Sequence, residues 1–352
     1  MQLHPKFRLN GTAYSHDSLL SVAKKWQNSS NNEQQELGLF LKTWLIDSDT
    51  IIVHTSGSTG APKPLEVSKK AMRASAEQTA AFFNLLPGDT ALLCLPIQYI
   101  AGKMMLVRAM VIGLDIDLIP PKTLLDLKDK SYDFAALIPL QASASINLLK
   151  NLKTILIGGA PIPGALRKAL AKKQLHCIET YGMTETLTHV ATRPVTYPPV
   201  PFLAMPGIVV DVDSDNCLIL TVPYISETAI CTNDVVELID EKSFRLLGRR
   251  DLVINSGGKK IFPERLEEKL ADFLDFPFFF TGIPDATLGE KLVFVIAGDS
   301  KEMQNALKIA TEVLGTDKHH IPKEVVCIEA FVHTKSGKLD RVATLRKVMS
   351  EL

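Results

Sequence analysis

A short block near the start of the chain combines the residue types that bind a polyphosphate. It consists of Thr55, Ser56, Gly57, Ser58, Thr59 and Gly60, with Lys63 three residues further on. Glycines let the backbone turn sharply toward a ligand, hydroxyl groups add hydrogen-bond donors, and the lysine adds positive charge. The Walker A spacing is absent, so this is a different kind of phosphate loop. The alternative interpretation is an ordinary turn rich in serine and glycine.

Five further blocks downstream carry residues suited to a nucleotide site. They are Gly158-Gly159-Ala160, Tyr181-Gly182-Met183-Thr184-Glu185-Thr186, Thr232-Asn233-Asp234, Gly248-Arg249-Arg250-Asp251 and Thr334-Lys335-Ser336-Gly337-Lys338-Leu339-Asp340-Arg341. Together with the first block they resemble, in order and spacing, the acyl-adenylate-forming ligases, which include acyl-CoA synthetases, firefly luciferase and the adenylation domains of peptide synthetases. The resemblance covers nearly all of the chain from about residue 51 onward. It implies an enzyme that uses ATP to make an acyl adenylate and pyrophosphate before a thiol attacks the acyl carbon.

The resemblance implies how the charged end of ATP is bound. The loop 55–63 is expected to hold the β- and γ-phosphates. Thr184 is expected to donate a hydrogen bond to the α-phosphate, and Glu185 to hold Mg²⁺, a cation that prefers oxygen ligands. Lys338 is expected to be the catalytic lysine, whose ammonium bridges the acid and the α-phosphate where negative charge gathers. ATP, Mg²⁺ and coenzyme A are therefore the expected co-substrates.

The resemblance also implies which residues bind adenosine. They are Gly158, Gly159, Ala160, Tyr181, Gly182, Asp234 and Arg249. The glycine pair passes close to the adenine, where a side chain would clash, and Tyr181 stacks on the base or is simply a core tyrosine. Asp234 accepts hydrogen bonds from the ribose hydroxyls, and Arg249 reaches the ribose or a phosphate. The usual family triplet before this aspartate is Thr-Gly-Asp, and we expect Asn233 to replace the glycine because asparagine tolerates a positive φ.

A mobile C-terminal domain follows from the same resemblance. Asp251 is the expected hinge, although Leu252 stands where many members have a second aspartate. Large closures need a few residues that absorb a change in φ and ψ. After rotation the domain is expected to present Gly257, Gly258 and Lys259 to coenzyme A.

The acid is harder to predict than the nucleotide. A family block that often carries an aromatic–histidine pair has Gln98-Tyr99 here, and only about fifty residues precede the phosphate loop. The compact chain is similar to the o-succinylbenzoate–CoA ligases of menaquinone synthesis. That acid has a second carboxylate, which needs a cationic or polar partner, and the candidates are Lys103, Arg108 and His189.

Two alternatives remain at this stage. The first is a CoA ligase for a fatty or aryl acid, and the second is a nucleotide-binding module that no longer catalyses. The presence of Thr184, Glu185, Asp234 and Lys338 argues against the second. A peptide-synthetase adenylation domain is disfavoured because no carrier-protein module follows Leu352.

Hydrophobic periodicity and turn residues predict an α/β fold. We expect residues 1–250 to form an AMP-binding domain of helices on an open sheet with a small β subdomain over 202–247, and residues 251–352 to form a small α+β lid. Helices are expected at 18–26, 33–45, 68–86, 102–112, 143–150, 163–173, 263–274, 301–314 and 342–349. Strands are expected at 51–53, 91–95, 134–138, 153–157, 177–180, 278–283, 292–297 and 325–331.

Composition excludes several other classes. Lysine plus arginine and aspartate plus glutamate both number 39, so no net charge favours nucleic acid or an anionic membrane. The five cysteines are scattered, which is typical of buried thiols in a reducing compartment. No apolar run approaches ~18 residues, and the N-terminus lacks a signal peptide, so a cytoplasmic protein is expected. The sequence does not decide between a monomer and a homodimer.

Overall fold

The computed structural model describes residues 2–54, 63–298, 300–333 and 339–351. Their contacts form two compact units. The first comprises Met1–Ile162, Leu166–Val209 and Thr221–Ile230, and the second Pro163–Ala165, Val210–Leu220 and Cys231–Leu352. This grouping places residues 231–250 with the C-terminal part, whereas the sequence predicts a boundary at residue 250. A hinge at that boundary stays a prediction.

The first unit is built on a parallel sheet. Its strands lie in the order β9 (Cys177–Gly182), β8 (Leu152–Ile157), β7 (Tyr132–Leu137), β5 (Thr90–Leu93), β6 (Asp115–Leu118) and β1 (Arg8–Leu9). Antiparallel strands extend it, β10 (His189–Pro194) and β11 (Phe202–Ala204) beyond β9, and β2 (Thr12–Ala13) beyond β1. Because parallel strands end at one edge, the segments that follow β5, β8 and β9 gather there, as in other ligand-binding α/β sheets.

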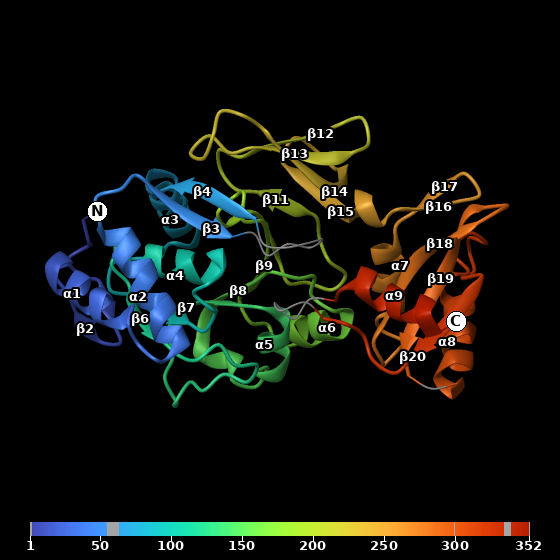
Figure 1. The fold of residues 1–352 in the computed structure, drawn as a ribbon, viewed down its shortest axis with the longest axis horizontal. Helices are drawn as coiled ribbons and strands as arrows, with labels where there is room; N and C mark the ends of the chain where they lie inside the picture. The colour runs from blue at the N-terminus through green and yellow to red at the C-terminus, as the bar shows by residue number, and fades with distance from the viewer. Residues whose placement is uncertain (1, 55–62, 299, 334–338, 352) are drawn as a thin grey trace. The chain divides into compact units, whose positions relative to one another are not determined.

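Helices cover both faces of this sheet (Figure 1). One face packs against α1 (His16–Trp26), α2 (Asn32–Leu45), α3 (Lys69–Phe83) and α4 (Ile100–Ile112), and the other against α5 (Pro139–Ala144) and α6 (Gly164–Lys172). Trp44 and Phe134 are fully buried in the first layer, and Ile155 in the second. Burial on both faces explains why central strands such as β5 and β8 are largely apolar.

A two-stranded hairpin carries the predicted phosphate loop. Strands β3 (Thr50–His54) and β4 (Pro64–Ser68) pair antiparallel, and the pair His54–Pro64 closes the base of the loop. Residues 55–62 lie outside the described residues. Ser68 then caps α3 by accepting hydrogen bonds from the backbone N–H groups of Lys70 and Ala71, as the sequence predicts.

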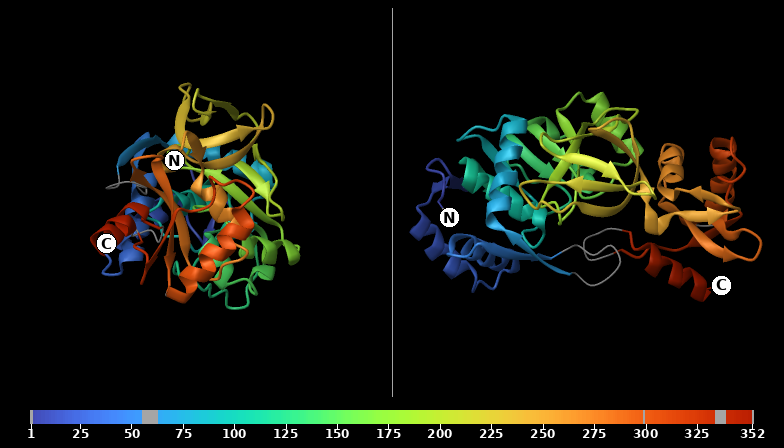
Figure 2. Two further views of the ribbon diagram at one scale, coloured as in Figure 1. Left: turned by 90° about the vertical axis from the view of Figure 1, so that its right-hand side faces the viewer. Right: turned by 90° about the horizontal axis from the view of Figure 1, so that it is seen from above.

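The second unit contains two groups of strands. One comprises β12 (Val209–Val212), β13 (Cys217–Thr221), β14 (Ile230–Leu238) and β15 (Ser243–Arg249) in that order. The other has the order β17 (Lys259–Ile261), β16 (Ile254–Ser256), β19 (Gly289–Ala297) and β18 (Phe278–Asp285), with β20 (Glu324–Ile328) parallel to β19. Helices α7 (Pro263–Leu270) and α8 (Ser300–Leu314) pack on one face, and side chains near the start of α9 (Arg341–Glu351) on the other. The red α9 lies beside the orange strands in Figure 2.

The predicted α/β class is confirmed, and most elements occur where the sequence places them. The helix predicted at 143–150 is wrong, because α5 starts at Pro139, whose fixed φ and missing N–H suit a first helical position. It ends at Ala144, and a 3₁₀ turn follows at Leu149–Asn151. Helix α7 and strand β20 end earlier than predicted, at Leu270 and Ile328. No helix in the described part of the chain is long and apolar enough to cross a membrane.

Candidate active site

A tight turn between β9 and β10 positions two of the predicted catalytic residues. The hydroxyl of Thr186 accepts a hydrogen bond from Met183 N at 2.9 Å and lies 2.8 Å from the carbonyl oxygen of Thr188. This turn buries most of Thr184 and leaves Glu185 exposed. We predicted no separate role for Thr186, although a threonine three residues after Met183 is a recognisable side-chain-to-backbone pattern.

Two glycines of the nucleotide blocks lie where no side chain fits. A Cβ atom on Gly182 would lie 2.2 Å from Thr188 O, and one on Gly158 would lie 2.3 Å from the Thr180 hydroxyl. Gly159 adds a positive φ of 82°. The backbone after β8 and at the end of β9 is therefore tightly packed, and Ala160 follows on the surface.

Tyr181 packs in the core beneath this turn. It is 8% exposed, and its ring centroid lies 5.9 Å from that of Phe202 on β11. The guanidinium of Arg193 on β10 lies 4.1 Å from the centroid of the same Phe202 ring. Because little of Tyr181 is exposed, the structure favours the core interpretation, and stacking on adenine stays a prediction.

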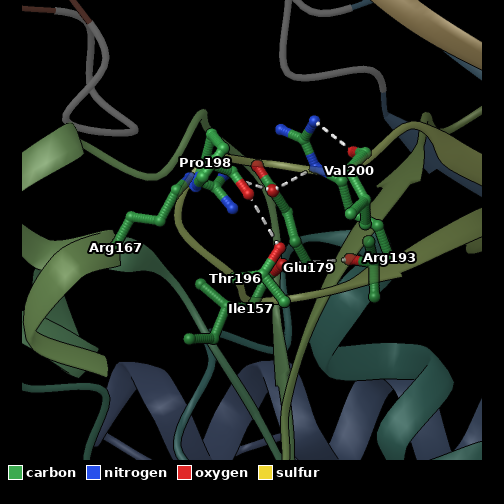
Figure 3. A network of polar contacts seen from close by, with 8 residues as sticks. Ile157, Arg167, Glu179, Arg193, Thr196, Pro198 and Val200 are labelled. Carbon is green, nitrogen blue, oxygen red and sulfur yellow. Dashed lines mark hydrogen bonds and ion pairs between the residues drawn. The ribbon is translucent and has the colours of Figure 1, made fainter. Parts of the chain in front are cut away.

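A buried ion cluster holds these strands together (Figure 3). The carboxylate of Glu179 on β9 accepts hydrogen bonds from Arg167 on α6 and from Arg193 on β10, the latter at 2.6 Å. Arg193 also donates to the carbonyl of Val200 at 3.1 Å. A carboxylate removed from water in this way needs its partners, so the cluster fixes β9 just before its ligand-binding end. No local pattern in the sequence predicts this cluster, because its three residues come from three different elements.

The predicted ribose residues lie opposite each other in the second unit. Asp234 on β14 pairs in register with Arg249 on β15, and the nearest oxygen and guanidinium nitrogen are 3.7 Å apart. Arg249 also makes two hydrogen bonds to Asp251, at 2.9 and 3.2 Å. Burial alone would lower the pKa of Arg249, but hydrogen bonds and charge from Asp251 and the charge of Asp234 outweigh it and raise the pKa. The predicted ribose and hinge residues thus form one ion cluster.

Asn233 does not have the positive φ that its place in the Thr-Gly-Asp triplet predicts. It lies within the extended strand β14 and is absent from the residues with a positive φ. Its side-chain oxygen instead accepts a hydrogen bond from Arg250 at 2.8 Å. The substitution of glycine by asparagine therefore supplies an acceptor for the neighbouring arginine.

The predicted coenzyme A segment is a hairpin turn. Gly257 and Gly258, with φ values of 58° and 79°, join β16 to β17, the arrangement expected of a two-residue turn with positive φ at both positions. Lys259 follows, and its ammonium lies 3.4 Å from a carboxylate oxygen of Asp317. A role for these three residues toward coenzyme A stays a prediction.

Two predicted parts of the site, the phosphate loop and the catalytic lysine, lie outside the residues that the structure describes. Residues 55–60 and Lys338 lie outside the described residues, whereas Lys63 is described and exposed. The ends of the Lys338 segment are anchored, because His333 pairs with Leu339 and the Asp340 amide donates to Val332 O at 2.9 Å.

The candidate acyl residues surround the start of α4 and the end of the β9–β10 turn. Tyr99 is the N-cap residue of α4, and Gln98 is exposed beside it. The Lys103 ammonium donates hydrogen bonds to the carbonyls of Ile97 and Gln98. Arg108, further along α4, is only 2% exposed.

Comparison with known proteins places this geometry in a family. The model of the AMP-binding enzyme family matches residues 15–217, more than half of the chain. The chain belongs to the AMP-binding enzyme family. A curated 2-succinylbenzoate–CoA ligase from Listeria monocytogenes serotype 4b is 24% identical, over 87% of this chain and 72% of that protein. A ligase of the same name from Bacillus cereus strain ZK is 26% identical over 86% and 70%.

Solved structures agree with this assignment. An acyl-CoA synthetase (AMP-forming)/AMP-acid ligase II-like protein from Dyadobacter fermentans is 33% identical, with a TM-score of 0.59 over 93% of this chain and 98% of that one. The o-succinylbenzoate CoA synthetase of Bacillus subtilis in complex with ATP and magnesium has a TM-score of 0.72 at 19% identity, covering 84% and 69%. The predicted enzyme class, an AMP-forming acyl-CoA ligase, is confirmed, as are ATP, Mg²⁺ and CoA as its co-substrates.

The residues of this family member fit ATP and magnesium. Glu185 presents an exposed carboxylate beside the buried Thr184, and the tight packing around Gly158 and Gly182 leaves backbone without a side chain where adenine is predicted to bind. Glu185 is the residue that would hold Mg²⁺, which when bound offsets phosphate charge. The individual contacts to ATP stay predictions.

The cross-strand ion cluster gives a first test. Asp234→Asn keeps the shape of the side chain but removes the negative charge, so we expect the KM for ATP to rise by roughly tenfold, the scale of a lost charged hydrogen bond. Pyrophosphate release at varied ATP concentration measures this. Asp211→Asn, on the exposed side of β12, is the matched control and should leave KM unchanged. An unaltered KM in the Asp234 variant would remove this residue from the ribose site.

Proposed function

We propose that this ligase activates o-succinylbenzoate and transfers the acyl group to coenzyme A. The observation that supports this acid is the buried guanidinium of Arg108 on α4. The names of the curated relatives agree with it, since they are 2-succinylbenzoate–CoA ligases. The rival is a CoA ligase for a fatty or aryl acid with one carboxylate.

Arg108 is buried without a carboxylate to balance it among the described residues. One guanidinium nitrogen donates to the hydroxyl of Thr188, and another lies 3.6 Å from the sulfur of Met105. Its Nε has no hydrogen-bond partner in the described part of the chain. Burial lowers the pKa of Arg108 to about 10, so the group remains charged at neutral pH. A buried, unbalanced cation is costly, which favours a site for an anionic ligand.

The position of Arg108 suits a substrate more than ATP. Its partner Thr188 ends the turn that carries Thr184 and Glu185, and the next residue is the buried His189. Burial, and then the charge of Arg108, lower the pKa of His189 well below its usual value. His189 is therefore neutral, with Nδ1 3.1 Å from the Thr188 hydroxyl, and Arg108 supplies the positive charge of this cluster. A second carboxylate on the acid would meet that charge.

The residues then divide the chemistry between them. Arg108 would bind the carboxylate that does not react, and this orients the acid. Thr184 would donate to the α-phosphate at which the other carboxylate attacks. Positive charge and hydrogen-bond donors placed where negative charge develops lower the barrier to this step. Asp234 would hold the ribose.

A panel of acids with CoA, read by mass spectrometry of the thioester, tests this function. The decisive pair is o-succinylbenzoate and 4-oxo-4-phenylbutanoate, which lacks only the ring carboxylate. We expect the parent enzyme to prefer the dicarboxylate. In Arg108→Met this preference should fall by at least roughly tenfold, because a buried charge pair is lost.

The matched control is Arg73→Met, which removes an exposed guanidinium from α3. It should leave the preference unchanged. Better turnover of a fatty or simple aryl acid by the parent enzyme would overturn the proposal in favour of the rival ligase. ATP binding without acid-dependent pyrophosphate release would instead indicate a non-catalytic module.

A further inference from the structure

We propose that Lys103 is a positioning residue that fixes the segment 96–99 at the start of α4 and so shapes the acyl side of the site. The claim about the acid rests on the proposed function, whereas the claim about the segment does not. Lys103 is one of the three residues that the sequence offers as partners for the second carboxylate. Its observed contacts point to a different role.

The ammonium of Lys103 forms hydrogen bonds with two backbone carbonyls. It donates to the carbonyl oxygen of Ile97 at 2.7 Å and to that of Gln98 at 2.8 Å. Both carbonyls precede the N-cap of α4, Tyr99, and so belong to the non-helical entry segment. Two of the three ammonium hydrogens are therefore used by this segment, and their loss would leave two carbonyls without these donors.

The same ammonium also contacts the helix α2. It lies 5.9 Å from the ring centroid of Phe40, within range of a cation–π interaction. Burial lowers the pKa of Lys103 to about 8, and the charge of Glu36, also on α2, acts in the opposite direction. Lys103 thus links α2 to the entry segment of α4 from a position largely removed from water.

A second close contact involves the same segment. A Cβ atom on Gly102 would lie 2.4 Å from the carbonyl oxygen of Pro96, so only glycine lets the segment pack this closely on the first turn of α4. Gly102 permits the approach, and Lys103 supplies the attraction that maintains it. What remains exposed is Gln98, at the place where the family often carries an aromatic–histidine pair. The position of Gln98 and Tyr99 therefore depends on Lys103.

Lys103→Met tests this role because methionine keeps an apolar stem but cannot donate to the two carbonyls. We expect faster deuterium uptake in the peptide covering residues 95–103. In the same variant kcat/KM for the acid should fall by roughly 10- to 100-fold, the scale of a small misplacement in a reacting site. The KM for ATP should not change, because the predicted ribose residues Asp234 and Arg249 lie on β14 and β15, outside this segment.

Lys70→Met, an exposed lysine on α3, is the matched control and should leave all three quantities unchanged. Unchanged deuterium uptake in Lys103→Met, or equal losses toward the acid and ATP, would overturn the proposal. If another acid proves to be the substrate, the uptake result still decides the role of Lys103. Failure of this inference and failure of the proposed function are thereby distinguished.

Discussion

Lys338→Ala is expected to lower the rate of acyl-adenylate formation by about 10²- to 10³-fold, as when one positioned donor is removed from a developing negative charge. Thioester formation from a supplied acyl adenylate should proceed close to the parent rate. The physical reason is that the lysine charge is needed only while the carboxylate attacks the α-phosphate. The thiol step forms a bond at the acyl carbon and releases AMP, whose phosphate is already stable.

The surroundings of the lysine segment support this assignment. His333 and Leu339, the residues on either side of the segment, pair with each other, and Arg341 at the start of α9 makes two hydrogen bonds of 2.7 Å to the carboxylate of Glu267. The described residues on either side of the segment are therefore held by contacts with the rest of the chain. Lys335→Ala, in the same segment, is the control and should retain both half-reactions. Rapid-quench measurement gives the rate of each half-reaction separately. Equal losses of rate in both would show that Lys338 does not act in adenylation alone.

Gly182→Ala is expected to disable the enzyme through its backbone. The added methyl group would lie 2.2 Å from Thr188 O and 2.8 Å from the Cα atom of His189, so the β9–β10 turn must shift. Overpacking of this kind costs about 1–3 kcal/mol in the free energy of unfolding. The activity loss should be larger, roughly 100-fold in adenylation, because the turn carries Thr184 and Glu185.

Gly11→Ala separates this effect from a general cost of replacing glycine. Gly11 has a φ of 73° in the hairpin between β1 and β2, and a Cβ atom there would have no neighbour within 4 Å. Its substitution should cost about 1 kcal/mol through backbone strain alone and leave adenylation intact. Urea unfolding and pyrophosphate release measure the two quantities. Full activity in Gly182→Ala would show that the turn tolerates the shift and that its geometry is not critical.

Local signals in the sequence predicted local structure well. A serine just before a periodic apolar run is a helix-start signal, and Ser68 caps α3; apolar runs likewise predict strands such as β8 and β9. These features depend on residues within one turn or strand, so neighbouring residues suffice to reveal them. The helix predicted at 143–150 is wrong, because the helix starts at Pro139, a start signal that lies outside the predicted range.

By itself, the sequence determined the enzyme class, because six blocks with fixed residue types in a fixed order define the chemistry on ATP. The tertiary structure decided which side chains face one another. It paired Asp234 with Arg249, placed Arg167 and Arg193 on Glu179, and buried Arg108 beside Thr188. Each of these contacts joins residues at least a dozen positions apart, and their pairing depends on strand register and helix packing. Burial and the pairing of charges, on which the proposed acid rests, emerge only at that level.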